Sequence, residues 1–352
     1  MKTNQIHWAY DRARDLYAEY GVDTEQVLDE MQDFQVSLPM SSARRDILWA
    51  MALIPGQHRL TLDESEAARI DDWIDWARQH RVKLDYNFND LNLREAKGLT
   101  LASANNEERA RWIDHAKLCR QTANAMGEAQ RDPCHLNICV SDGSKYVPVD
   151  HYLYRQLLEA SFDEVFAQRY LWVKDSIEPQ PAGIDMGAAG ANDFHLGYAV
   201  KHKMMVTLDT GAGLHPETMA DKVSAMLCHV PGLLLHLRSA WGKTYEHVAQ
   251  MDDTMLALYQ EVARCGVINR VHNMLAGFDG AIEYKRACVI GARAAQRCMM
   301  RALLEPTTML QNYEMSGRRF ERLALIEHCK TLPWSAVYDE YCTRNEVALK
   351  PR

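Results

Sequence analysis

Short apolar or β-branched segments recur along the chain, and segments with helical periodicity separate them. Strands that alternate with helices are typical of parallel βαβ units, and eight such units close into a (β/α)8 barrel, the TIM barrel. The predicted strands are 35–40, 59–63, 82–88, 135–140, 170–175, 204–209, 233–238 and 271–277. An open sheet of six or seven strands is the alternative, because the first and last segments are weak.

Helical segments account for most of the remaining chain. Amphipathic patterns predict helices at 65–80, 106–127, 150–168, 216–229, 248–265 and 281–304. We expect an N-terminal helical extension over 1–34, a barrel over 35–304, and a C-terminal helical extension over 305–352 that packs on the barrel. A dinucleotide-binding fold is disfavoured because no G-x-G-x-x-G follows an early strand. The nearest glycine-rich stretch, GAAGAND at 187–193, is expected to precede a strand rather than a helix.

Composition argues against several classes of protein. The 40 Lys and Arg residues and 48 Asp and Glu residues give a net charge of −8, whereas nucleic-acid-binding proteins usually carry a basic excess. No stretch approaches the length of an apolar membrane span, and the charged N-terminus lacks the apolar core of a signal peptide. The nine cysteines include no C-x-x-C pair, which favours free thiols in a reducing compartment. We therefore expect a cytoplasmic protein that contacts neither nucleic acid nor membrane.

Polar residues at the strand ends are the candidate site, because barrel enzymes place their chemistry at the carboxyl ends of the strands. Asp175, Asp209 and His236 lie at the ends of three consecutive predicted strands. Two carboxylates and an imidazole could coordinate Mn²⁺ or Mg²⁺, and His215 and Glu246 in the following loops could join them. Structural roles are the alternative, because strand-end polar residues commonly cap the next helix and His236 could equally be a hydrogen-bonded core histidine.

Several segments resemble the L-rhamnose isomerases, and they follow one another in order over nearly the whole chain. The clearest are NDFHLGYA at 192–199, TLDTG at 207–211, HPETMADKVSAML at 215–227, VPGLLLHL at 230–237, RVHNMLAGFD at 270–279 and ALIPGQHRLTL at 52–62. The resemblance implies a (β/α)8 barrel and a homotetramer. It also implies a reaction that interconverts an aldose and a ketose with two divalent metals.

The resemblance carries over only part of the family's structural metal site. The aspartate of the family's L-D-x-G motif matches Asp209, and the histidine of the next strand matches His236. The last carboxylate of that site falls on Ala276. The remaining glutamate lies on the fifth strand, in a region with gaps, where Asp175 is a candidate substitute and Val173 is an equally arguable match. The lysine that follows that glutamate, a proton-transfer residue in the family, has no clear counterpart.

The catalytic metal site is reduced further. The family's G-H-x-H-P reads GAGLHP here, so one ligand histidine falls on Ala212 and only His215 survives. The family's W-D-S-D-H reads KTYEH, so its two aspartates become Thr244 and Glu246. The family's histidine on the second strand falls on Asp63. The loop that follows the first strand in the family is missing between the residues at 40 and 41.

These losses shape the functional expectation. Thr and Ala cannot replace carboxylate and imidazole as ligands of a hard cation. We expect an L-rhamnose-isomerase-like barrel protein of carbohydrate metabolism without the metal-dependent isomerase activity, either sugar-binding or structural. An active sugar isomerase or epimerase with a rebuilt metal site is the alternative, and an enzyme of another class in the same pocket is a third possibility. No catalytic residue is assigned. The expected cofactor is none, or one weakly bound Mn²⁺ or Mg²⁺, and the expected partners are a small sugar and further copies of the chain.

Overall fold

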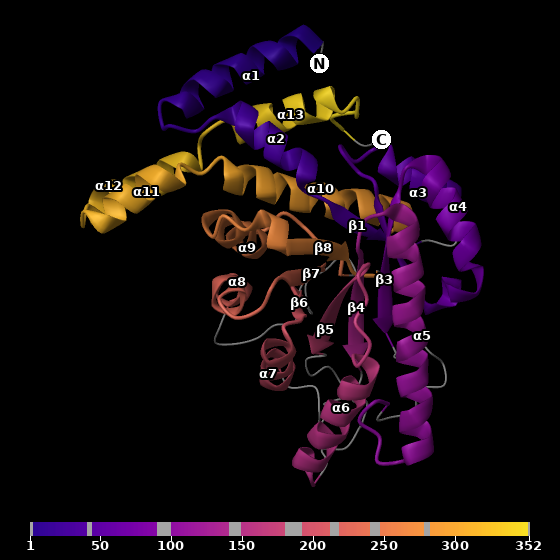
Figure 1. Ribbon diagram of the computed structural model, residues 1–352. Coiled ribbons are helices and arrows are strands. Elements are labelled where there is room, and N and C mark those ends of the chain that lie inside the picture. The colour runs from indigo at the N-terminus through magenta and orange to yellow at the C-terminus, as the bar shows by residue number, and fades with distance from the viewer. Residues whose placement is uncertain are drawn as a thin grey trace.

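A computed structural model of the protein contains a closed barrel of eight parallel strands (Figure 1). The structure describes residues 3–40, 44–89, 100–140, 149–179, 192–211, 218–239, 247–277 and 282–350. The strands are β1 (Val36–Pro39), β2 (Arg59–Asp63), β3 (Lys83–Asn89), β4 (Cys134–Val140), β5 (Val173–Pro179), β6 (Met205–Asp209), β7 (Leu233–Leu237) and β8 (Val271–Leu275). They neighbour one another in chain order, and β1 closes the barrel by pairing with β8. The predicted TIM barrel is confirmed, and the alternative of an open sheet is wrong.

Side chains along each strand alternate between the barrel interior and the surrounding helices, because successive residues of a strand point to opposite faces. In β7, Leu233 and Leu235 belong to the large apolar core that the strands share with the helices. Leu234 packs instead with Met205 and Met274 in a separate small cluster. The barrel interior is therefore a compartment of its own, and its residues can change without disturbing the contacts that hold the helices.

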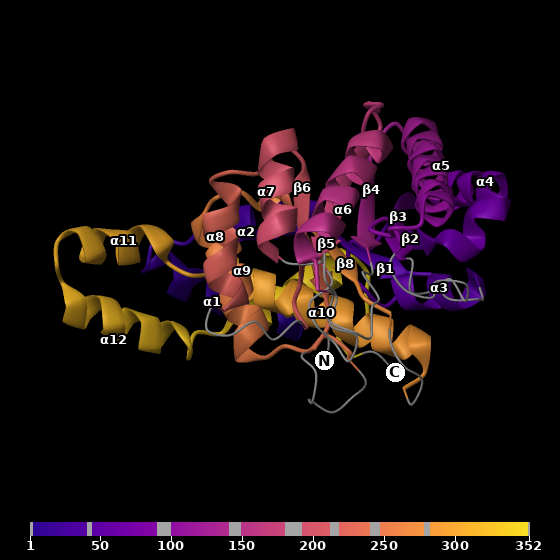
Figure 2. The same ribbon diagram turned by 90° about the horizontal axis from the view of Figure 1, so that it is seen from below.

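Helices surround the barrel on its outer face (Figures 1 and 2). They are α3 (Arg44–Met51), α4 (Ile70–His80), α5 (Asn106–Gln130), α6 (His151–Val165), α7 (Asn192–His202), α8 (Met219–Leu227), α9 (Asp253–Arg264) and α10 (Tyr284–Leu303), with 3-10 turns η1 (Glu64–Arg69) and η3 (Ile268–Arg270). Local chemistry starts several of them: the Asn105 side chain accepts hydrogen bonds from the first N–H groups of α5, and Thr218 with Asp221 forms a capping box at α8. The expectation that GAAGAND precedes a strand is wrong, because α7 begins at Asn192.

The two ends of the chain contribute five further helices. These are α1 (Thr3–Ala18), α2 (Thr24–Asp33), α11 (Thr307–Met315), α12 (Arg319–Cys329) and α13 (Trp334–Arg344). The first and last of them pack side by side above α10 (Figure 1). In their contact the Nδ1 atom of His7 lies 2.7 Å from a carboxylate oxygen of Glu340, and Arg344 of α13 also forms an ion pair with Glu25 of α2 (2.6 Å). The helices α11 and α12 form a hairpin that extends away from the barrel.

Two sequence predictions concern disulfide bonds and membrane-spanning helices. No disulfide joins any of the nine cysteines, as their spacing predicts. Within the part of the chain that the structure describes, no helix combines the length and apolar character that a membrane crossing requires.

Two helical glycines provide a matched test of how tightly the helices pack on the barrel. A Cβ at Gly127 of α5 would lie 2.1 Å from the backbone oxygen of Trp172, whereas a Cβ at Gly197 of α7 would meet nothing within 4 Å. We expect Gly127→Ala to lower the free energy of unfolding by at least about 2 kcal/mol, because backbone must move. Gly197→Ala should raise it by about 0.5–1 kcal/mol through the better helix propensity of alanine. Urea unfolding of both variants measures the difference, and equal effects would contradict this packing.

Candidate functional site

Three buried ionisable residues meet at the carboxyl ends of neighbouring strands. Glu178 lies on β5, Asp209 on β6 and His236 on β7, and the last two are register partners. Their exposed fractions are 3%, 6% and 9%. Buried ionisable groups are costly unless they are paired, so the partners of each group determine what the site can do.

Glu178 and His236 form a buried ion pair. The Nδ1 atom of His236 lies 3.0 and 3.2 Å from the two carboxylate oxygens of Glu178. Burial opposes the charge on Glu178, but attraction and hydrogen bonding from His236 overcome it and hold the pKa of the carboxyl below its ordinary value. Burial likewise disfavours the charged imidazole, yet attraction from Glu178 raises the pKa of His236 above its ordinary value. The two side chains thus stabilise each other as an anion and a cation.

Asn137 on β4 holds this pair in place through a network inside the barrel. Its amide nitrogen donates hydrogen bonds to Glu178 and to the side-chain oxygen of Asn87 (2.9 Å). Its amide oxygen accepts a hydrogen bond from the hydroxyl of Thr207 (2.7 Å), which in turn contacts the Ser176 hydroxyl at 2.7 Å. Every polar atom of the Asn137 side chain is therefore engaged, and the orientation of Glu178 is fixed by four strands.

Asp209 is paired with a different cation, the guanidinium of Arg238, which follows β7. The Nε atom of Arg238 donates to one carboxylate oxygen at 2.7 Å, and its Nη2 atom donates to the other. The backbone N–H of Gly211 also donates to Asp209 at 2.9 Å. Burial disfavours the charged guanidinium, but hydrogen bonding and attraction from Asp209 raise the pKa of Arg238 above its ordinary value. Both oxygens of this carboxylate are occupied in a bidentate pair.

The structure does not bring Asp175 to this group. Asp175 faces the helical layer, where both of its oxygens accept hydrogen bonds from Arg120 of α5 at 2.9 and 2.8 Å. Arg120 is 1% exposed and also donates to the backbone oxygen of Val165. Residues 175 and 178 lie on opposite faces because they are an odd number of positions apart in one strand. Glu178 therefore occupies the place on the fifth strand for which the sequence suggested Asp175 or Val173.

Glu178 was missed because the predicted strand stopped too early. The run Lys174, Asp175 and Ser176 is polar and predicts the end of a strand, whereas β5 continues to Pro179. The run is polar inside a strand because Ser176 faces the hydrogen-bonded interior and Asp175 is paired with an arginine. The signal that could have found Glu178 is the Glu-Pro pair, since proline is excluded from the interior of a central strand and the strand can therefore extend only as far as Pro179.

Some of the other predicted site residues lie in the part of the chain that the structure describes, and some lie outside it. His215 and Glu246 lie outside the described residues, as do the residues at 212 and 244. Ala276 is buried directly after β8 and its methyl side chain offers no ligand atom. Asp63 ends β2 and accepts a hydrogen bond from the N–H of Ser65 at 2.9 Å, so it caps the following turn. Asp63 therefore has a structural role, in which it caps the turn after β2.

The donor set does not fit the two-metal centre that the resemblance implies. Across the residues that the structure describes, no group of three or more His, Cys, Asp or Glu side chains is arranged to hold a metal ion. Glu178 and Asp209 are the two carboxylates retained among these donors, and each is already paired with a protein cation. The position expected for a further carboxylate is Ala276. A divalent cation would have to break both pairs and would lack that ligand.

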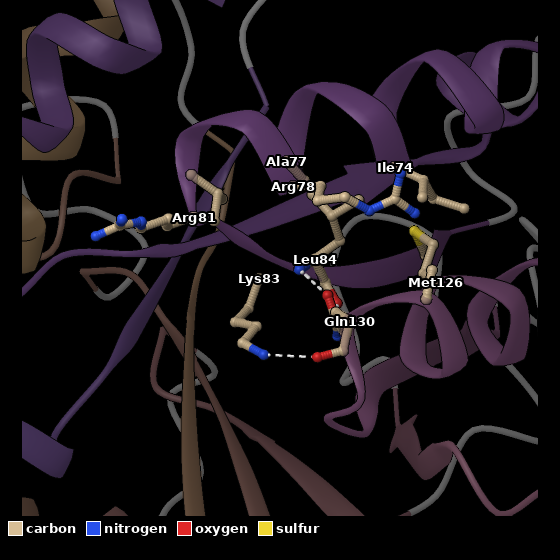
Figure 3. A pocket seen from close by; sticks show the side chains of 10 residues that line it. Ile74, Ala77, Arg78, Arg81, Lys83, Leu84, Met126 and Gln130 are labelled. Atoms are coloured by element: carbon tan, nitrogen blue, oxygen red, sulfur yellow. Dashed lines mark hydrogen bonds between the residues drawn. The ribbon is translucent and has the colours of Figure 1, made fainter.

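Two cavities lie away from this site. One, of about 410 Å³, is at the opposite end of the barrel and is lined in part by Arg59, Asp85 and Lys174. The rings of His135 and His272, which also line it, are in contact there, tilted by 32° with centroids 3.6 Å apart. The other, of about 260 Å³, lies outside the barrel between α4, α5 and the start of β3 (Figure 3). Neither contains the residues at the carboxyl ends.

The fold defines a TIM barrel, and the group of ionisable residues lies at the carboxyl ends of its strands. The structure is similar to a 3-keto-D-glucoside 4-epimerase from Escherichia coli, with a TM-score of 0.52 and 12% identity over 75% of this chain and 98% of that one. It is also similar to an L-ribulose 3-epimerase, with a TM-score of 0.51 and 11% identity over 80% of this chain and 97% of that one. At such identities the likeness concerns the fold alone.

The family follows from the sequence comparisons. The profile of the L-rhamnose isomerase (RhaA) family matches residues 39–352. An L-rhamnose isomerase of Bacteroides thetaiotaomicron is 41% identical over 396 positions, which cover 98% of this chain and 94% of that protein. One of Rhodopirellula baltica is 35% identical over 400 positions, covering 98% and 93%. The chain belongs to the L-rhamnose isomerase family, as the resemblance predicts. Because 396 aligned positions exceed the 352 residues of this chain, the relative contains internal residues that this chain lacks.

The Glu178–His236 pair predicts a pH window of stability. The raised pKa of His236 gives a contribution that is complete below its ordinary value of 6.5 and fades as the pH rises through the raised pKa. The lowered pKa of Glu178 gives a contribution that is complete above its ordinary value of 4.5 and fades as the pH falls through the lowered pKa. The pair should therefore stabilise the fold most between pH 4.5 and 6.5.

We expect Glu178→Gln to lower the free energy of unfolding within that window by about 3 kcal/mol, because a buried charge loses its partner. Thermal unfolding of wild type and variant across the acidic and alkaline range measures the difference. Glu159, in an exposed pair with Lys201, supplies the control: Glu159→Gln should change little at any pH. A difference for Glu178→Gln that is the same in the window and at alkaline pH would contradict the ion pair.

Proposed function

We propose that this rhamnose-isomerase-like barrel of sugar metabolism binds a small sugar at the carboxyl ends of its strands without performing metal-dependent isomerisation. The observation that carries the proposal is the pairing of the two retained carboxylates. Glu178 is neutralised by His236, and Asp209 by Arg238. Ala276 stands where the resemblance implies a third carboxylate. The described site is therefore balanced in charge without a divalent metal.

The chemistry of the family reaction gives this pairing its significance. Interconversion of an aldose and a ketose moves a proton between carbon atoms and develops negative charge on two substrate oxygens. A divalent cation beside both oxygens supplies the stabilisation when it is bound. His236 and Arg238 are cations, but each is already oriented toward a protein carboxylate. Binding of a neutral sugar needs hydrogen-bonding groups and not a free cation, so binding can persist where catalysis is lost.

An active isomerase or epimerase with a rebuilt site is the second candidate. Its support is that the relatives quoted above are named L-rhamnose isomerases and that Glu178, Asp209 and His236 still lie together. His215 and Glu246 would complete such a site. This candidate requires a metal to displace Arg238 from Asp209.

A ketose assay distinguishes the two candidates. Purified protein with excess Mn²⁺ and L-rhamnose should produce no ketose above the uncatalysed rate. The isomerase from Bacteroides thetaiotaomicron serves as the positive control in the same buffer. Calorimetric titration with L-rhamnose should still detect saturable binding. Turnover near the typical enzyme value of about 10 per second would contradict the proposal and favour the rebuilt site.

The proposed location of the protein is the cytoplasm. No disulfide joins its nine cysteines. Cysteines in such number without a disulfide favour a reducing compartment.

We also infer that the chain self-associates, with the tetramer of the family resemblance as the expected assembly. The hairpin of α11 and α12 extends from the barrel (Figures 1 and 2), and large apolar side chains near its turn are exposed. Met315 is 88% exposed, Phe320 is 80% exposed and Leu323 is 59% exposed. Exposed apolar side chains gathered on a projecting element are typical of a protein–protein contact.

Light scattering tests this surface. Wild type should have a mass several times that of one chain, and Phe320→Glu combined with Leu323→Glu should shift it toward the monomer, because the charges must then be desolvated at the contact. Leu171 is an equally exposed side chain before β5, so Leu171→Glu is the control and should leave the mass unchanged. A monomeric wild type at micromolar concentration would reject the assembly.

A further inference from the structure

We propose that Arg238 is a resident cation that takes the place of a divalent metal at Asp209, so that the site excludes the metal while this arginine is present. The inference deepens the proposed function and rests on it. It concerns a residue that the sequence analysis did not single out. Three observations support it: the geometry of the pair, the residues that hold the arginine, and the charge of the group.

The geometry of the pair leaves Asp209 no oxygen for another cation. Both carboxylate oxygens accept hydrogen bonds from one planar guanidinium, and one of them also accepts the N–H of Gly211. The carboxylate is 5% exposed and the arginine side chain 23% exposed, so water competes little for the pair. A bidentate contact of this kind is among the stronger polar interactions in proteins.

The segment around Asp209 is built to receive the arginine. The hydroxyl of Thr210 accepts a hydrogen bond from the backbone N–H of Arg238 at 2.9 Å and donates one to its backbone oxygen at 2.7 Å. Gly211 leaves the room that the side chain needs, since a Cβ there would lie 2.7 Å from Cγ and 2.8 Å from Nε of Arg238. Three consecutive residues after Leu208 thus contact the same arginine, one through its charge, one through its backbone and one by having no side chain.

The charge of the group opposes a metal as long as the arginine remains. Glu178 and Asp209 carry two negative charges, and His236 and Arg238 balance them. A divalent cation would add an uncompensated double charge to this buried group. A histidine could lose its proton to make room, but an arginine stays charged at any relevant pH. Removing the guanidinium should therefore open the position, since the two carboxylates and the imidazole are suitable metal ligands.

The test is a comparison of Mn²⁺ binding, followed by electron paramagnetic resonance of the free ion and by calorimetry. Wild type should leave the signal of free Mn²⁺ unchanged. Arg238→Ala and Arg238→Gln should bind one Mn²⁺ per chain at least about tenfold more tightly than wild type. Adding Asp209→Asn to either variant should remove the gain. Arg264→Ala is the matched control, because it breaks another bidentate arginine pair, with Glu305, and should not create a Mn²⁺ site.

Folding of the variants is monitored by circular dichroism, because both substitutions leave Asp209 without its partner. If a variant unfolds in metal-free buffer, excess Mn²⁺ should restore its structure, and failure to do so would overturn the proposal. Folded variants without tighter Mn²⁺ binding would also overturn it. If wild type binds Mn²⁺ stoichiometrically and Asp209→Asn abolishes this binding, the proposal is overturned even without a variant at position 238.

The ketose assay keeps this inference separate from the proposed function. Wild type that neither binds Mn²⁺ nor forms ketose, with variants that gain no Mn²⁺, would reject the role of Arg238 alone. Wild type that forms ketose without tight Mn²⁺ binding would reject the proposed function alone. Wild type that binds Mn²⁺ through Asp209 and forms ketose would reject both.

Discussion

The hydrogen-bonded network through Asn137 is the constraint on which the carboxyl-end half of the barrel depends. The interior of the barrel is buried, so each polar group there must be bonded to remain stable. Asn137 connects Asn87, Glu178 and Thr207, and through them four neighbouring strands. Because Glu178 is held in this way, His236 has a fixed anion to face. The geometry of this pair therefore follows from the hydrogen bonds of the barrel interior.

Sequence reasoning was most reliable where a physical pattern repeats. Eight strands alternating with helices and the neighbouring positions of Asp209 and His236 could all be predicted, because period and chain order determine them in a barrel. Glu178 could not, because a strand that is polar on its inner face and carries a buried ion pair through Asp175 does not look like a strand. Arg238 was overlooked for a related reason. An arginine after an apolar strand normally points to solvent, and only the tertiary contact with Asp209 gives it another role.

The separation of the two faces of each strand allows the family fold to be kept when residues of the site change. Leu233 and Leu235 face the helices and belong to the main core, whereas the residue between them packs inside the barrel. Substitutions on the inner row change charge and ligand atoms but leave the contact of strand with helix in place. A chain can therefore match its relatives over 98% of its length and still differ in the groups that reach a ligand.

The contact between the rings of His135 and His272 determines whether a molecule can pass through the barrel. These residues come from β4 and β8, which lie four strands apart in a ring of eight, so the rings meet across the barrel axis. Met205, Leu234 and Met274 form an apolar cluster inside the same barrel. Together these side chains fill the barrel interior, so that it is a packed core and not an open channel. A ligand of the site at the carboxyl ends of the strands therefore cannot reach it through the barrel interior from the opposite end.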